Sequence, residues 1–156
     1  MSWLIECANK NCKQTTKAAE VVDLIKNHTN KQGYFLCKCG QFGYIKKDFA
    51  LQEKGKNWEP FLRGVITLAD SKDIYQPFVF MVSYTADGEI TDVWFSYYKD
   101  LRSAKGKLKL GYGPGGPPVL DKKNFFRLIN RMIEIGYISP NDFFKINSSR
   151  SIEYET

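Results

Sequence analysis

The sequence lacks several features that mark common classes of protein. His28 is the only histidine among 156 residues, so a Ser-His-Asp or Cys-His catalytic apparatus has almost no room outside its segment. No apolar run approaches the length of a membrane span. The first residues, Met-Ser-Trp-Leu-Ile-Glu-Cys, have neither the basic nor the apolar stretch of a signal peptide. We therefore expect an intracellular protein of the reducing cytoplasm, without a membrane partner.

Cysteine is also scarce, but its four copies fall in two close pairs. Cys7 and Cys12 enclose Ala-Asn-Lys-Asn, while Cys37 and Cys39 enclose a single lysine and are followed by Gly40. Asn and Gly tolerate the left-handed backbone of a tight turn, so each pair can direct its thiolates at one metal ion. Four sulfur ligands favour a closed, structural zinc site, although iron uses the same ligands and stays open.

Two other interpretations of the cysteines are disulfides and unrelated buried thiols. Disulfides suit a secreted chain, for which the N-terminus gives no sign. Scattered core thiols do not need to occur as pairs beside turn residues. The single histidine, His28, follows an apolar stripe and fits a helix end better than a metal ligand, because four thiolates are already available.

The segments around the cysteine pairs predict a small zinc-stabilised unit over residues 1–52. Apolar spacing predicts a helix over Lys17–Asn27, capped by Thr15 or Thr16. Three short strands are expected, at Trp3–Glu6, Tyr34–Leu36 and Phe42–Ile45. Paired cysteines between short strands resemble the zinc-ribbon pattern, here with a helix inserted between the pairs. Such modules commonly serve nucleic-acid or protein contact, so the resemblance favours both functions equally.

The second predicted unit, residues 61–146, is an antiparallel sheet with a helix, which makes the fold class α+β. Residues 53–60 are charged and contain Gly55 and Pro60, as a connection does. Strands are expected at 61–68, 78–85 and 90–98, the last two joined by an Asp-Gly hairpin turn. A helix over Lys122–Ile135 begins at the cap Asp121 and ends at Gly136. Its apolar spacing predicts that Arg127 and Arg131 lie on the solvent side and that the buried stripe consists of Phe125, Leu128, Ile129, Met132 and Ile133. Residues 147–156 are expected to form a flexible tail.

Both faces of the predicted hairpin are rich in apolar and aromatic residues. Phe78, Phe80 and Tyr84 share one face of the first strand, and Trp94 and Tyr97 belong to the second strand. A strand pair covered on both sides explains this pattern. An exposed platform on which unpaired bases stack explains it as well. Burial is the commoner cause.

Positive charge is unevenly distributed and suggests a polyanionic partner. The net charge is +6 overall, and residues 101–123 alone carry six basic residues and one acid. If residues 105–109 form a strand, its lysines project together toward phosphates, or they protect a sheet edge. Arg127 and Arg131 lie one helical turn apart and can share a phosphate, or they are simply solvated. The predicted nucleic-acid-binding residues are Arg102, Lys105, Lys107, Lys109, Arg127 and Arg131.

Three functions follow from these patterns. The first is nucleic-acid binding on a zinc-stabilised frame, without catalysis. The second is a protein-interaction module that uses the aromatic sheet and the Gly-Pro loop at 111–118. The third is a metal-dependent hydrolase, for which Asp92, Asp121 and Lys123 form only a loose approximation to the residue set of a metal-dependent nuclease. The glycines of that loop also spell G-x-G-x-x-G, but two prolines follow where a nucleotide-binding helix would begin.

Overall fold

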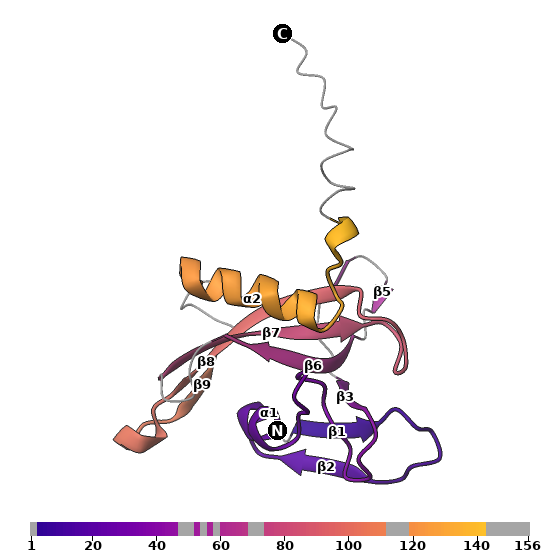
Figure 1. Cartoon of the computed structure of the whole chain (residues 1–156). Helices are drawn as coiled ribbons and strands as arrows, with labels where there is room; N and C mark the ends of the chain where they lie inside the picture. The colour runs from indigo at the N-terminus through magenta and orange to yellow at the C-terminus, as the bar shows by residue number, and fades with distance from the viewer. Residues whose placement is uncertain are drawn as a thin grey trace.

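The computed structural model describes residues 3–46, 52–53, 56–57, 60–68, 74–111 and 119–142, and it has an α+β fold (Figure 1). One antiparallel sheet has the strand order β2-β1-β3-β6-β7-β8-β9. These strands are β1 (Trp3–Cys7), β2 (Thr15–Ala18), β3 (Gly43–Lys46), β6 (Phe61–Thr67), β7 (Tyr75–Ser83), β8 (Asp92–Asp100) and β9 (Leu108–Leu110). The remaining elements are β4 (Gln52–Glu53), β5 (Lys56–Asn57), the helices α1 (Val21–Asn27) and α2 (Lys122–Glu134), and the 3-10 helix η1 (Arg102–Ala104).

The strand β7 forms the centre of the molecule. It pairs with β6 on one side and with β8 on the other, so the hairpin predicted around Asp87-Gly88 is confirmed. Phe78 and Phe80 pack with the apolar residues of α1 on one face of the sheet. Val79 and Met81 pack with α2 on the other face. Figure 1 shows α2 and the N-terminal segment on opposite sides of these strands. The apolar residues of β7 are therefore buried, not an exposed platform.

The N-terminal segment that contains the four cysteines and the larger sheet are continuous. Strand β3 pairs with β1 and also with β6, through Ile45 opposite Leu62. The loop before the second cysteine pair also joins β6, because the amide of Val65 donates to Gly33 O (2.8 Å) and that of Phe35 to Arg63 O (2.9 Å). The predicted units 1–52 and 61–146 thus share one sheet. The tail 147–156 and the loop 112–118 lie outside the described residues.

The N-terminal helix is shorter than predicted. Residues Thr15–Ala18 form β2 and pair along β1, so neither Thr15 nor Thr16 caps a helix. Helix α1 begins at Val21, and the side chain at its N-cap, Glu20, makes no capping bond. The β-branched threonines prefer an extended backbone, and the free edge of β1 supplies the partner that makes it stable. In place of the strand predicted over residues 34–36, the structure has three isolated bridges.

Helix α2 follows its predicted limits but not its predicted orientation. The carboxylate of Asp121 accepts a hydrogen bond from the amide of Asn124 (2.7 Å), and Gly136 adopts a φ of 77°, so both end signals are confirmed. Leu128 and Met132 are buried as expected. The expected burial of Phe125 and Ile133 was wrong, because these side chains are 50% and 39% exposed.

Helix α2 is rotated about its axis relative to the predicted orientation. This rotation also changes the surroundings of Arg127 and Arg131, which were expected on the solvent side. Arg127 donates to the carbonyl oxygen of Leu68, and Arg131 donates to that of Lys31 (2.9 Å). Long arginine stems cover the edge of the core while their guanidinium groups satisfy backbone carbonyls. The helix therefore buries a stripe displaced toward its arginines.

In the described part of the chain, no helix is long and apolar enough to cross a membrane.

Candidate metal centre and basic surface

The fold brings all four cysteines to one point beside β1 and β3. Cys7 is the last residue of β1, and the bridge from Leu36 to Phe42 folds Cys37 and Cys39 back toward it. The sulfur atoms of Cys7 and Cys39 lie 3.6 Å apart, and those of Cys12 and Cys37 lie 3.9 Å apart. All four sulfurs lie within 4.8 Å of one another. They are free thiols, not disulfides.

Local hydrogen bonds shape both cysteine turns. In the first turn, the Asn9 carbonyl accepts from the amide of Cys12 (2.9 Å), while its side-chain oxygen accepts from the amide of Asn11 (3.0 Å). In the second, the amide of Gly40 donates to Cys37 O (2.9 Å), and Gly40 has a φ of 82°. This left-handed conformation favours glycine. The Asn and Gly residues singled out in the sequence thus form the turns.

The four-sulfur geometry fits a tetrahedral metal ion. Zinc–sulfur bonds of about 2.3 Å at tetrahedral angles place neighbouring sulfurs about 3.8 Å apart, close to the two short distances here. Four cysteine thiols can therefore hold one metal ion at this point. The same donor set leaves no position for a substrate, as in structural sites. The single histidine, His28, is not part of the group and forms the C-terminal cap of α1.

The protonation of the thiols also fits a site that requires a cation. Burial raises the pKa of the Cys7 thiol to about 12, and burial also raises the pKa of Cys37. The exposed Cys39 differs, since a hydrogen bond from the backbone of Gln41 lowers its pKa to about 7. Buried thiols lose their protons readily only when a metal ion compensates the charge. Metal binding is therefore expected to release protons.

The basic residues predicted to bind nucleic acid are not all equally free, since some are exposed and others are paired with acids. Arg102 is held by Asp100, to which it donates two hydrogen bonds of 2.8 and 2.7 Å, and it also lies 3.6 Å from Asp23 of α1. Lys105 and Lys107 are exposed. They precede β9, and Lys105 has a φ of 58° beside η1, so residues 105–109 do not form the predicted single strand. The tight turn after η1 breaks the alternation that the lysine spacing suggested.

Lys109 belongs to β9 opposite Lys99, but its side chain lies outside the described part of the structure.

The acidic residues considered for hydrolysis have ordinary structural roles. Asp121 caps α2, and Asp92 accepts a hydrogen bond from the hydroxyl of Thr91 (2.9 Å). The described residues contain one group able to hold a metal ion, and it is the cysteine group.

A basic pocket of about 350 Å³ lies where α1, β6 and α2 meet. Its charged lining residues are Lys26, Lys31 and Arg131, accompanied by neutral polar groups such as Gln76. No carboxylate is among the residues that line it. The ammonium group of Lys26 lies 3.8 Å from Asp100, which in turn binds Arg102. The pocket is therefore linked around α1 to the basic residues near η1.

Comparison with known proteins adds no assignment. No protein-family model, curated protein or solved structure matches this chain. The site must therefore be interpreted from its own chemistry. Lys26 and Lys31 were not among the predicted binding residues, and the only signal for them was the excess of lysine in residues 1–59. That signal did not show which lysines meet Arg131.

Proposed function

We propose that this protein binds nucleic acid through its phosphate backbone, on a frame that a structural zinc ion stabilises. The pocket formed by Lys26, Lys31 and Arg131 carries the proposal, because it gathers three cations from two distant segments without a lining carboxylate. Phosphate oxygens are recognised mainly by Lys and Arg, with help from neutral polar groups. The net charge of +6 favours the same partner.

The proposed contact surface extends from this pocket along α1. We define the basic strip as Lys26, Lys31, Arg102, Lys105, Lys107 and Arg131. Asp23, Asp100 and Glu134 lie against members of the strip and offset part of its charge. These acids also hold the guanidinium groups of Arg102 and Arg131 in place, so fewer rotamers are lost when phosphate binds. Because Phe78 and Phe80 of β7 are buried, binding is expected to depend on charge more than on base stacking.

Zinc is the metal that we propose for the cysteine site. It prefers tetrahedral sulfur ligands and needs no redox partner in a structural role. Iron in the same cage absorbs visible light, so the two metals are distinguished by spectrum as well as by elemental analysis. In this proposal the metal has no catalytic role. It fixes the turns that hold β1 and β3 beside β6.

The proposal is tested by fluorescence anisotropy with labelled DNA and RNA strands of about 20 nucleotides, longer than one binding site. For about five phosphate contacts, affinity is expected to fall roughly 100-fold between about 50 and 200 mM salt. Lys31→Glu should weaken binding to every sequence and reduce the salt slope by about 1 or more. Lys122→Glu, an equal charge change at the far end of α2, is the matched control. Equal losses in both variants, or binding that ignores salt, would refute the proposal.

A second candidate function is protein contact through the outer face of α2. Phe125 and Phe126 are 50% and 55% exposed, and Ile133 on the same helix is 39% exposed. Exposed aromatic residues of this kind are enriched at protein interfaces. A second copy of this chain is the simplest partner for such a face. Sedimentation across protein concentrations tests it, because Phe126→Ser should remove any self-association and leave nucleic-acid binding unchanged.

A further inference from the structure

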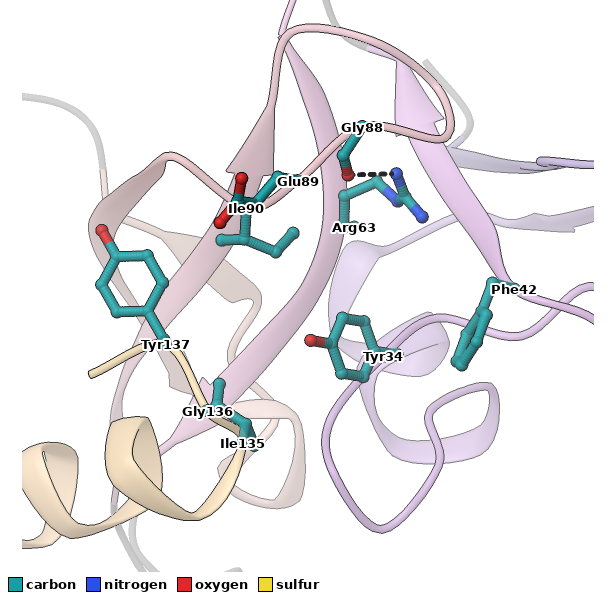
Figure 2. Close-up of a pocket in the computed structure, with 9 residues that line it drawn as sticks. All are labelled: Tyr34, Phe42, Arg63, Gly88, Glu89, Ile90, Ile135, Gly136 and Tyr137. Carbon is teal, nitrogen blue, oxygen red and sulfur yellow. Dashed lines mark hydrogen bonds between the residues drawn. The ribbon is translucent and has the colours of Figure 1, made fainter. Parts of the chain in front are cut away.

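A second cavity, of about 380 Å³, shares no lining residue with the basic pocket and has a different chemistry (Figure 2). Three parts of the fold contribute to it. Tyr34 and Phe42 come from the cysteine-containing segment, Arg63 from β6 and Ile90 from the loop between β7 and β8, and Tyr137 from the turn after α2. Most of the exposed lining is apolar. The volume is that of a site for a small organic molecule.

Arg63 is the unusual member of this lining. It lies in β6, only 8% of its surface is exposed, and a buried arginine normally has a carboxylate partner. One terminal nitrogen donates to the carbonyl oxygen of Gly88 (3.1 Å). The Nε–H is buried and has no hydrogen-bond partner among the described residues. Figure 2 shows the second terminal nitrogen turned away from Gly88.

The charges near Arg63 do not neutralise it. No salt bridge joins Arg63 to any carboxylate in the described ranges, and Asp87 acts on it only through space. Burial lowers the pKa of Arg63 from its ordinary value, as expected for a cation removed from water. A guanidinium has five N–H donors, and one hydrogen bond to a neutral carbonyl uses only one of them. The site therefore holds a buried cation that has spare donors and no direct carboxylate partner among the described residues.

From these observations we infer that the cavity binds a small monocarboxylate with an apolar or aromatic body, its carboxylate on Arg63. A carboxylate matches the fork of a guanidinium and offsets its single charge. A phosphate dianion fits less well, because Glu89 lines the same cavity and Asp87 lies close by. The aromatic wall is firm, since the rings of Tyr34 and Phe42 pack edge to face at 5.4 Å. An apolar ligand body can pack against these rings and Ile90.

The inference is independent of nucleic-acid binding, because none of the basic strip lines this cavity. Its test uses the full-length, metal-loaded protein and isothermal titration with a matched pair of probes. The probes are 3-phenylpropionate and its neutral amide, with indole-3-acetate as a second acid. The acids are expected to bind at least tenfold more tightly than the amide, as a charge-assisted hydrogen bond requires. Amide chemical-shift changes in the NMR spectrum should centre on Tyr34, Arg63 and Gly88.

Variants distinguish the contribution of the Arg63 guanidinium to ligand affinity from the contribution of the shape of the cavity. Arg63→Met keeps an apolar stem without leaving a buried charge, so it is expected to fold and to lose the preference for the acid. Arg63→Lys keeps the charge but not the fork, and an intermediate affinity is expected. Lys122→Gln, which also removes one positive charge but lies at the N-terminal end of α2 and does not line the cavity, is the control and should bind the acids as the wild type does. Equal affinity for acid and amide in the wild type overturns the inference, as does failure of both acids to bind at millimolar concentration.

Discussion

Arg131 of α2 donates a hydrogen bond of 2.9 Å to the carbonyl oxygen of Lys31, a residue one hundred positions earlier in the chain. This bond ties the C-terminal helix to the loop that precedes the second cysteine pair. Arg131 lines the basic pocket together with Lys26 and Lys31. The segment that contains the cysteines and the basic pocket are therefore connected through α2.

Removal of the metal is expected to destabilise the whole protein, because β3 belongs to both the cysteine segment and the sheet. Protein purified without chelator should contain one zinc ion per chain by elemental analysis. Stripping it should lower the melting temperature by about 10 °C, equivalent to roughly 3 kcal/mol or more. Acid should have the same effect, since protons compete for the thiolates. An unchanged melting curve after complete stripping would contradict a structural role.

Asp100 is expected to stabilise the link between β8 and α1. Hydrogen bonds from Arg102 lower the pKa of Asp100 to about 2, so its carboxylate is charged and paired near neutral pH. Because this pKa is depressed, Asp100 contributes its full stabilisation at pH values above its ordinary pKa near 4. This contribution is lost as the pH falls through about 2. Because the pair is partly solvated, we expect Asp100→Asn to cost only about 0.5 to 1 kcal/mol.

Urea unfolding of wild type and Asp100→Asn measures this contribution. The difference between the two proteins should be largest at pH 7 in low salt and should shrink in high salt. It should also shrink below pH 4, where metal release affects both proteins alike. Glu20→Gln, at the N-cap of α1 without a capping bond, is the control for loss of one carboxylate.

The face that α2 buries can be tested by two substitutions on that helix. Leu128 is 2% exposed, and Leu128→Ala should cost about 2 to 4 kcal/mol through lost packing against the sheet. Phe126 is 55% exposed, and Phe126→Ala should cost about 0.5 kcal/mol or less. Denaturant unfolding gives both values. Similar costs would mean that the helix buries a different face.

The close approach of β6 to the loop at residues 33–34 requires Gly64. A Cβ atom there would lie 2.3 Å from the carbonyl oxygen of Gly33 and 2.7 Å from the Cα of Tyr34. Both neighbours are backbone atoms and cannot rotate away. Gly64→Ala should therefore cost about 2 kcal/mol or more and weaken metal retention. Gly136→Ala is the comparison, because it has open space and strains only the backbone. Equal metal retention in wild type and Gly64→Ala would argue against this coupling.

Several elements could be predicted because their signals are local. Asp121 and Gly136 mark the limits of α2 through hydrogen bonds and backbone angles that involve only a few neighbouring residues. The Asp87-Gly88 turn likewise predicted the hairpin of β7 and β8. Close spacing within the two cysteine pairs, next to Asn and Gly, predicted a group able to hold a metal ion.

Other features depend on partners far away in the chain. Thr15 and Thr16 form a strand because β1 lies beside them, and no local pattern announces that pairing. The apolar stripe of α2 is broad, and the sequence did not show which half the sheet would cover.

Local sequence patterns were enough to predict the paired thiols, the turn positions, the limits of α2 and the excess of positive charge. No local pattern shows that Lys26, Lys31 and Arg131 line one pocket, or that Arg63 is buried beside a cavity, because both depend on the packing of distant segments. Turns and caps are fixed by covalent geometry and short-range hydrogen bonds, which neighbouring residues specify. The two pockets arise where segments distant in sequence pack together, so their chemistry is set by the sheet order and the orientation of α2.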